Sequence, residues 1–223
     1  MAQVRTIEIH EDVTSLNDRT ADFVRETMKK QGTLFMNVMS SPGSGKTTLL
    51  SALINQMKDK VNIAEMDVDI ESSVDAQRVA DMTGVRALQI NNGGLCHIDA
   101  DMTSRALMEF DTKGVDLLIL ENIGNLVCPA EFDTGAHLNL MLLSVPEGDD
   151  KPLKYPLMFS VCDIVLITKI DTVGFFDFDF EKAEERIKHL NPNATIIPVS
   201  AKTGENLDKV EALLLEKVAE IKK

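Results

Sequence analysis

The feature that most constrains this chain is residues 40–47, SSPGSGKT, which join an apolar run to a helical pattern. Gly43 and Gly45 let backbone N–H groups curl around phosphate oxygens, because neither residue carries a Cβ. The start of the following helix adds its partial positive charge. Lys46 is placed to reach the β- and γ-phosphates, and the Thr47 hydroxyl to ligate Mg²⁺. The segment therefore predicts a nucleoside-triphosphate site of the P-loop type.

The motif departs from G-x-x-x-x-G-K-[ST] at its first position, where Ser40 replaces glycine. Ser40 is the residue at which the strand ends, so the change bears on backbone geometry more than on phosphate binding. A glycine- and serine-rich turn with an exposed lysine is the structural alternative. The predicted phosphate-binding residues are Gly43, Ser44, Gly45, Lys46, Thr47 and Thr48.

Short apolar runs alternate with amphipathic stretches along the chain, which indicates an α/β fold with a mostly parallel central sheet and helices on both faces. We expect one P-loop NTPase domain over residues 1–223, with residues 1–32 forming a strand and helix extension packed on the core. Predicted strands are 34–39, 62–66, 87–90, 117–120, 138–145, 164–168 and 195–199, and predicted helices are 17–31, 46–58, 73–83, 99–110, 180–190 and 206–222.

Charge and cysteine content exclude several classes of protein. The chain has 23 Lys and Arg against 36 Asp and Glu, a net charge of −13, which argues against nucleic acid or an anionic membrane as a partner. It has no apolar run long enough for a transmembrane helix, and its first residues lack the pattern of a signal peptide. Three widely spaced cysteines do not form a disulfide framework. We therefore expect a cytoplasmic protein with reduced thiols.

Two later segments favour guanine as the base. Residues 168–171, TKID, end an apolar run and are similar to the N-K-x-D motif of GTPases, with Thr in place of Asn. A carboxylate at Asp171 accepts from both N1–H and the 2-amino group of guanine, a donor pair that adenine lacks. Each segment alone is also typical of an ordinary loop, but their order after a P-loop favours GTP. The predicted base-binding residues are Thr168, Lys169, Asp171, Ser200, Ala201 and Lys202.

Acidic residues at two predicted strand ends are candidates for the magnesium and water shell. Asp67, with Asp69 as an open alternative, follows the second strand, and Glu121 follows the fourth. Mg²⁺ takes one or two carboxylates and keeps several waters. The Gly124 N–H is a candidate γ-phosphate contact. No arginine finger or water-orienting glutamine stands out, so we expect slow intrinsic hydrolysis. The predicted catalytic set is Lys46, Thr47, Asp67, Glu121 and Gly124.

Two thiols and an imidazole lie just beyond two predicted strand ends, at Cys96, His97 and Cys128. This donor set suits Ni²⁺ or Zn²⁺ and leaves a position for water or a ligand from a second protomer. The spacing alone favours structural cysteines, because buried cysteine is common as a small apolar residue. Cys162 lies within an apolar stretch and is expected to be core.

The motifs PGSGKTT, NGGLCHIDA, ENIGNLVCP, EGDDKPLKYP and TKID together resemble HypB, the family of nickel-incorporation GTPases of [NiFe]-hydrogenase maturation, over nearly the whole chain. The resemblance implies that Cys96, His97 and Cys128 hold the metal near a nucleotide-dependent dimer interface, and that Cys128 lies on the same loop as Gly124. It also implies a GTP-favoured homodimer, a HypA-like nickel/zinc protein and the hydrogenase large subunit as partners. Nucleotide state would then set metal affinity.

Some family features are missing or open. No cysteine precedes Cys96, so the nickel-storage motif of some HypB proteins is absent; His10, His137 and His189 are expected to be solvated or capping residues. The phenylalanine-rich residues 175–180 either pack in the core or form an interaction patch. Two further residues, Lys151 and Lys154, are either solvated or reach across a dimer interface.

Two alternative functions stay open. A UreG-like GTPase of urease maturation shares the phosphate site, but its Cys-Pro-His motif is absent here. A non-enzymatic scaffold would hold GTP and metal without turning GTP over.

Overall fold

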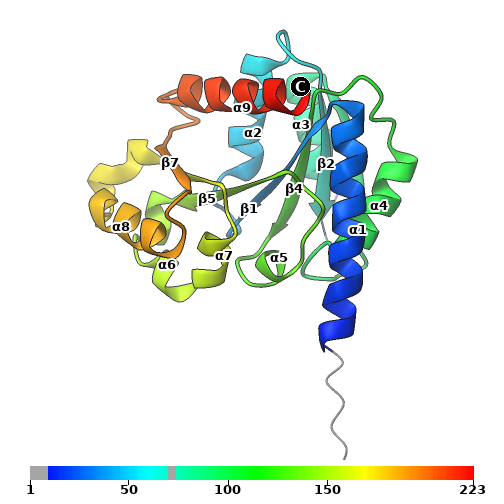
Figure 1. The fold of residues 1–223 in the computed structure, drawn as a ribbon. Helices are drawn as coiled ribbons and strands as arrows, with labels where there is room; N and C mark the ends of the chain where they lie inside the picture. The colour runs from blue at the N-terminus through cyan, green and yellow to red at the C-terminus, as the bar shows by residue number, and fades with distance from the viewer. Residues whose placement is uncertain (1–9, 70–73) are drawn as a thin grey trace, which may run out of the picture.

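The computed structural model describes residues 10–69 and 74–223. Seven strands form one sheet in the order β3-β2-β4-β1-β5-β6-β7, and every neighbouring pair is parallel (Figure 1). The predicted α/β class is confirmed, and the sheet is wholly rather than mostly parallel. The strands are β1 Leu34–Ser40, β2 Ile63–Asp69, β3 Arg86–Asn91, β4 Leu117–Gly124, β5 Leu138–Ser144, β6 Ile164–Thr168 and β7 Thr195–Pro198.

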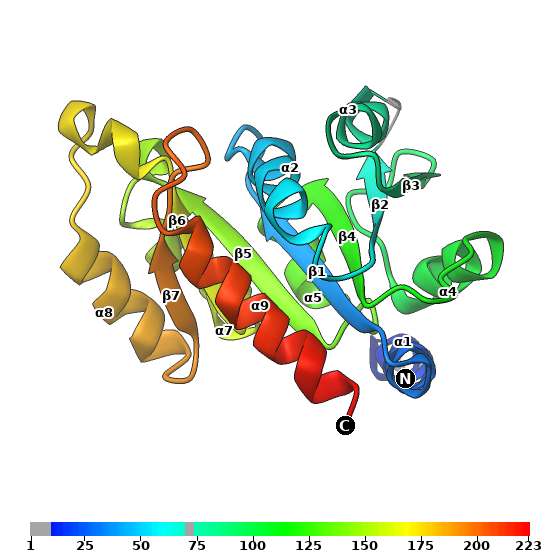
Figure 2. The ribbon, with the colours of Figure 1, turned by 90° about the horizontal axis from the view of Figure 1, so that it is seen from above.

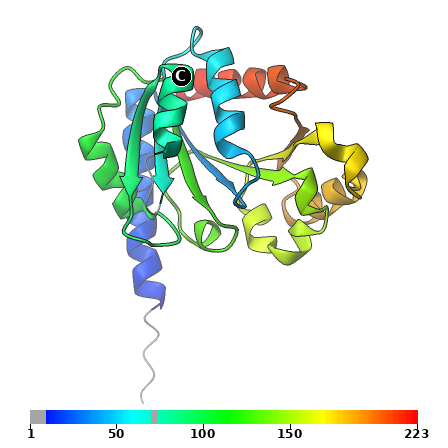
Figure 3. The same ribbon diagram turned by 180° about the vertical axis from the view of Figure 1, so that it is seen from behind.

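Helices cover both faces of the sheet. In Figures 1 and 2, α2 and α9 lie on one face, and α5 and α7 lie on the other. Figure 3, seen from behind, shows the teal β2 and β3 at one edge and the orange β7 toward the other. The helices are α1 His10–Gln31, α2 Lys46–Met57, α3 Val74–Thr83, α4 Ala100–Glu109, α5 Cys128–Glu131, α6 Lys151–Lys154, α7 Pro156–Ser160, α8 Phe180–Leu190 and α9 Leu207–Ile221, with 3₁₀ turns η1 Val145–Glu147 and η2 Ile170–Phe175.

The strand β4, which lies between β2 and β1, is longer than predicted. It continues to Gly124, and Asp67 lies inside β2, so the prediction that Asp67 and Glu121 follow their strands is wrong. Asp67 pairs with Glu121 across β2 and β4, and Ser40 pairs with Gly124 across β1 and β4. Pairing with β2 reaches Glu121 and pairing with β1 continues to Gly124, so the strand persists where its side chains become polar.

Other boundaries differ at the edges of elements. The short helices α5, α6 and α7 were not predicted, because four or five residues give no helical period. Each of them carries proline at its first or second position, where a missing N–H costs nothing. The strand predicted within residues 1–32 would fall on residues 1–9, which lie outside the described residues. Among the described residues, no helix is both long and apolar enough to cross a membrane.

His137 ties α1 to the sheet. The Phe35 N–H donates to His137 Nδ1 at 3.0 Å, so Nε2 carries the proton and donates to the Arg25 carbonyl at 2.9 Å. Burial lowers the pKa of His137 and keeps the ring neutral. The prediction that His137 is solvated or capping is therefore wrong. His189 is exposed, as predicted, and the His10 side chain lies outside the described part of the chain.

Polar side chains fix the register of the sheet centre. Asn122 Nδ2 donates to Asn37 Oδ1 at 3.0 Å, and Asn37 Nδ2 donates to Asn139 Oδ1 at 3.1 Å. These amides join β4, β1 and β5 below the P-loop. Asn122 Oδ1 also accepts from the Ile123 N–H at 2.8 Å, which orients the chain just before Gly124. Buried amides of this kind disfavour a slipped strand pairing, because a slip would leave them unpaired.

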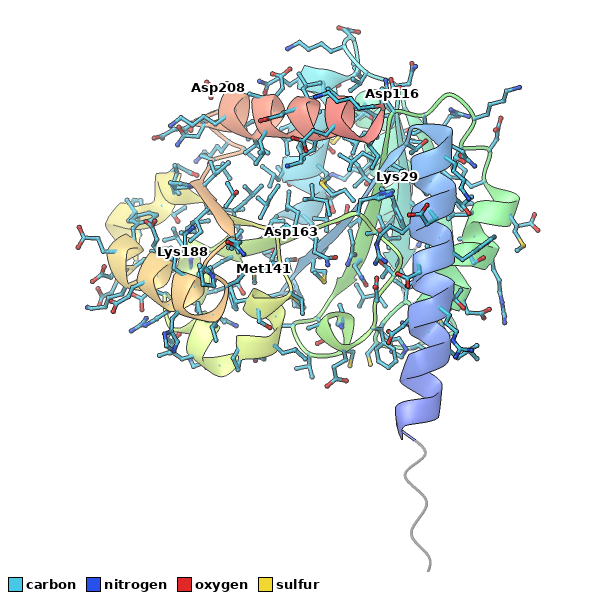
Figure 4. All side chains as sticks on the ribbon, in the orientation of Figure 1. Lys29, Asp116, Met141, Asp163, Lys188 and Asp208 are labelled. Carbon is cyan, nitrogen blue, oxygen red and sulfur yellow. The ribbon has the colours of Figure 1, made fainter. Side chains whose placement is uncertain are left out.

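The end of α9 is anchored beside the start of β4 (Figure 4). Asp116 precedes β4 and accepts from the Asn62 N–H at 2.8 Å while pairing with Lys222. Partial burial opposes ionisation of Asp116, but the Lys222 ammonium and the Asn62 N–H outweigh it and lower the pKa of the carboxyl.

The prediction that Cys162 is core is confirmed, since this residue is fully buried.

Candidate functional site

The P-loop has the backbone that its sequence predicts. Gly43 and Gly45 adopt positive φ angles of 74° and 98°, and α2 begins at Lys46. Ser40 is fully buried, and its hydroxyl accepts from Lys46 Nζ at 3.0 Å and donates to the Ser41 carbonyl at 2.8 Å. The residue that departs from the motif thus braces the loop and holds its lysine. Sequence reasoning treated Ser40 only as a geometric question and missed this contact.

The predicted guanine segment contacts the P-loop directly. Thr168 Oγ1 donates to the Ser44 carbonyl at 3.1 Å, and Lys169 Nζ donates to the Gly43 carbonyl at 2.7 Å. The Lys169 backbone is left-handed, with φ 59°, which turns its side chain back over the loop. The Thr168 hydroxyl therefore supplies a cross-link between the two motifs, despite its departure from asparagine.

A pocket of about 310 Å³ lies between the P-loop, the end of β6 and the loop after β7, where Ala201 and Lys202 line it with Thr48. Asp171 stands at its wall. Ser200 Oγ donates to Asp171 Oδ1 at 2.7 Å, and Lys202 Nζ lies 4.0 Å from Asp171 Oδ2. The Ser200 hydroxyl thus holds one oxygen of the Asp171 carboxylate and orients that carboxylate toward the space for a nucleobase. The predicted base-binding residues are brought together.

A larger cavity, of about 480 Å³, lies at the opposite, amino-terminal ends of the strands. It is lined by Lys29 from α1 and Asp163 before β6, both labelled in Figure 4, and by the end of α9. None of the predicted site residues lines this cavity. In an open parallel sheet, ligands bind outside the carboxyl ends of the strands, so the smaller pocket beside Asp171 is the candidate nucleotide site.

Carboxylates and a hydroxyl meet beside the phosphate loop. Thr47 Oγ1 donates to Glu121 Oε1 at 2.9 Å, and Glu121 and Asp67 are each only 4% exposed. These oxygen donors suit a hard cation, so the residues present fit Mg²⁺. The side chain of Asp69 is not described. Glu65, fully buried on the same face of β2 as Asp67, was not predicted; a carboxylate within an apolar strand was the available signal.

Gly124 lies against the P-loop. A Cβ at this position would lie 3.1 Å from both Pro42 N and Pro42 Cα, closer than nearly all real Cβ contacts. Only glycine allows this approach without displacing backbone. The end of β4 is therefore in contact with the phosphate loop, as the predicted role of Gly124 requires.

The two predicted thiol ligands lie side by side. Cys96 Sγ is 2.8 Å from Cys128 Sγ, and the hydrogen bond between them raises the pKa of the exposed Cys96 thiol. His97 Nδ1 is 4.0 Å from Cys96 Sγ, and its ring stacks on Phe132 with centroids 3.8 Å apart. Across residues 10–69 and 74–223, no three His, Cys, Asp or Glu side chains are grouped to hold a metal ion. The ligand role of His97 stays a prediction.

Residues 175–180, a candidate interaction patch, are partly buried and partly exposed. Phe175 and Phe176 are 86% and 44% exposed, whereas Phe178 is buried and meets Phe180 edge-on. The segment is thus part core and part surface. The two lysines have partners in the same chain: Lys151 Nζ lies 3.6 Å from Glu147 Oε1, and Lys154 pairs with Asp150. Their predicted role across an interface is not tested by these contacts.

Comparisons with known proteins agree with this geometry. The model of the CobW/HypB/UreG nucleotide-binding domain matches residues 34–198. The chain is 41% identical to hydrogenase maturation factor HypB of Rhizobium leguminosarum bv. viciae, over 96% of this chain and 71% of that protein. It is 42% identical to the hydrogenase/urease maturation factor HypB of Helicobacter hepaticus, over 97% and 90%.

A solved structure resembles the whole fold. The crystal structure of HypB from Helicobacter pylori in complex with nickel is 42% identical, with a TM-score of 0.85, and the match covers 92% of this chain and 95% of that one. The similarity therefore spans both the phosphate loop and the segments that carry the thiols.

Proposed function

Because the chain belongs to the CobW/HypB/UreG family and, within it, to the HypB proteins, we propose that it hydrolyses GTP to control the delivery of nickel to a [NiFe]-hydrogenase under assembly. The observation that carries this proposal is the path of the chain from Glu121, inside β4, to Cys128, at the start of α5. Residues 121–128 begin at Glu121, which accepts a hydrogen bond from Thr47 of the P-loop, and end at Cys128, whose sulfur lies 2.8 Å from that of Cys96. One short segment thus contacts both the phosphate site and the thiol pair.

The phosphate site has the groups that GTP hydrolysis needs. Backbone N–H groups of the P-loop and the Lys46 ammonium bind the phosphates, and Asp171 selects guanine. Thr47 and Glu121, with Asp67, would hold Mg²⁺, which would neutralise charge on the β- and γ-phosphates. Turnover is slow, because this arrangement relies on positioning and electrostatics with no arginine finger identified in the sequence.

Nickel is the cargo at the thiol pair. Cys96 and Cys128 donate two thiolates, and rotation of His97 off Phe132 brings an imidazole to the same side. Zn²⁺ accepts the same ligands. A second protomer completes the coordination in a GTP-favoured homodimer. When the γ-phosphate leaves, the contact between the P-loop and Gly124 relaxes and the position of Cys128 changes, so nickel passes to the next protein. A HypA-like nickel/zinc protein and the hydrogenase large subunit are the partners on this route.

The proposal is tested in two steps. Steady-state phosphate release from GTP is compared between the wild type and Lys46→Ala, and turnover by the wild type alone is expected; equal release would point to the scaffold alternative. Nickel is then titrated into the wild type and Cys128→Ala with GDP or a non-hydrolysable GTP analogue. The proposal predicts different nickel affinities in the two nucleotide states, and loss of tight binding in the variant. Equal affinities would rule out the coupling.

A second client is urease, because the similar protein of Helicobacter hepaticus is named a hydrogenase/urease maturation factor. The same GTP-dependent nickel release would serve both enzymes. Reconstitution separates the clients: the nickel-loaded protein with GTP is added to apo-hydrogenase or apo-urease, and nickel incorporation is counted in each. Incorporation into hydrogenase alone would exclude urease.

A further inference from the structure

Two thiols from separate segments lie within bonding reach. Cys96 Sγ and Cys128 Sγ are 2.8 Å apart, although the residues are 32 positions apart in sequence. A disulfide bond is about 2.05 Å long, so the sulfurs need to approach by less than about 1 Å. A displacement of this size lies within the range of small side-chain rotations. The two sulfurs are therefore placed to react with each other.

The backbones that carry the thiols are held in place. Asn92 Nδ2 donates to the carbonyls of Leu95 and His97, at 2.8 and 2.9 Å, and closes the loop around Cys96. On the other side, Asn125 Oδ1 accepts from the Val127 N–H at 2.9 Å, and Asn125 Nδ2 reaches the Cys96 carbonyl at 3.4 Å. Asn125 thus links the loop that carries Cys128 to the loop that carries Cys96. The proximity of the two sulfurs therefore does not depend on one side-chain rotamer alone.

Access separates this pair from the third cysteine. Cys96 is exposed and Cys128 is partly exposed, whereas Cys162 is fully buried. Cys162 Sγ donates to the Met158 carbonyl at 2.9 Å, and burial raises the pKa of its thiol far above the usual range. Because the thiolate is the nucleophile, Cys162 is inert towards oxidants in the folded protein. The molecule therefore holds an accessible pair of thiols and a buried thiol that serves as an internal control.

We propose that Cys96 and Cys128 are a reversible oxidation site, closed to an intramolecular disulfide by a low-molecular-weight disulfide such as oxidised glutathione. One thiolate attacks the oxidant and forms a mixed disulfide with release of one small thiol. The second thiolate then attacks the mixed disulfide, displaces the second small thiol and closes the Cys96–Cys128 bond. Two protein thiols lose two protons and two electrons, and the oxidant is reduced to two small thiols.

The disulfide withdraws both soft ligands from nickel while GTP still binds. The thiols lie beyond β3 and β4, whereas the guanine pocket is lined from the ends of β6 and β7, on the other side of β1 in the sheet. Oxidation thus separates the two activities, and the protein keeps its nucleotide but no longer takes nickel. This consequence rests on the proposed nickel site; formation of the disulfide does not.

The test uses the full chain, reduced and freed of metal, then treated with oxidised glutathione. Free thiols counted in denaturant are expected to fall from three to one, with a mass loss of two hydrogens and no bound glutathione. In Cys162→Ser they fall to none. Cys96→Ser and Cys128→Ser instead keep a mixed disulfide with glutathione. Nickel bound beforehand is expected to slow oxidation, and dithiothreitol is expected to restore both thiols and nickel binding.

Different results separate the possible failures. Stable glutathione adducts on both cysteines of the wild type, or disulfide-linked dimers on a non-reducing gel, would overturn the proposed intramolecular bond. An oxidised protein that takes up nickel as the reduced protein does would overturn the blocking role. A reduced protein that binds no nickel would instead refute the proposed function and leave the disulfide assignment standing.

Discussion

Replacing Asp171 with asparagine tests the assignment of GTP most directly. The variant keeps the shape of the side chain and one oxygen for the Ser200 hydroxyl, which donates to Asp171 Oδ1 at 2.7 Å. The second oxygen becomes an NH₂ group that faces the N–H donors of guanine. Hydrogen bonds to charged groups contribute about 1.5–3 kcal/mol each, so losing one and opposing two donors weakens binding by about 3 kcal/mol. That value corresponds to about a 100-fold rise in the Kd for GTP.

Titration calorimetry with GTP, GDP and XTP measures this change in affinity. Binding of XTP by the variant would show that its nucleotide site is still folded. Xanthine carries a carbonyl at C2 where guanine carries an amino group, so Asp171→Asn is expected to bind XTP more tightly than GTP. Asp18→Asn, an exposed change on α1, is the matched control and should bind GTP as the wild type does. If Asp171→Asn bound GTP as tightly as the wild type does, the assignment of Asp171 as the guanine-binding residue would be refuted.

Three further changes probe contacts elsewhere in the domain. Gly124→Ala places a Cβ 3.1 Å from Pro42 Cα, so we expect GTP turnover to fall about tenfold at a cost in stability of about 1–3 kcal/mol; unchanged turnover would contradict the contact. Asn37→Leu removes the partner of Asn122 Nδ2 and of Asn139 Oδ1 and should lower the free energy of unfolding in urea by about 3 kcal/mol; an unchanged free energy of unfolding would contradict the stabilising role of these two bonds. Burial lowers the pKa of His137, so its stabilising effect is complete above the unfolded value of about 6.5 and is lost as pH falls through the lower folded value. The urea stability of the wild type should therefore fall more steeply than that of His137→Gln between about pH 7.5 and pH 5, and parallel curves would contradict the buried neutral ring.

Local patterns predicted the conformation of the P-loop and the approach of the candidate base-binding segments. The P-loop glycines, Lys46 and Thr47 act through backbone conformation and helix start, which a short segment determines by itself. Residues 168–171 and 200–202 follow strands whose carboxyl ends meet at one edge, so their approach follows from a parallel sheet. The fold class followed from the alternation of apolar runs and amphipathic stretches.

Contacts that depend on neighbouring strands could not be predicted from the sequence pattern. The length of β4 depends on pairing with β1 and β2 on either side, and polar side chains in its second half hide it from a hydrophobic pattern. The role of His137 depends on α1 packing beside β1, which residues around position 137 do not reveal. The thiols follow β3 and β4, which are not neighbours, since β2 lies between them. Their proximity therefore depends on how two loops close over the end of β2.

The position of β4 gives the proposed coupling between nucleotide and metal ion a structural route. Pairing of β4 with β2 ends at Glu121, whereas pairing with β1 continues to Ser40 and Gly124, so the end of β4 is held by the strand that leads into the P-loop. Glu121 accepts from the P-loop threonine, Gly124 touches the P-loop backbone, and Asn125 reaches the Cys96 carbonyl. Only residues 125–127 separate the P-loop contact at Gly124 from Cys128. Under the proposed function, a displacement of Gly124 on γ-phosphate loss would therefore reach Cys128 over a few residues and change the distance between the two sulfurs, on which metal affinity would depend.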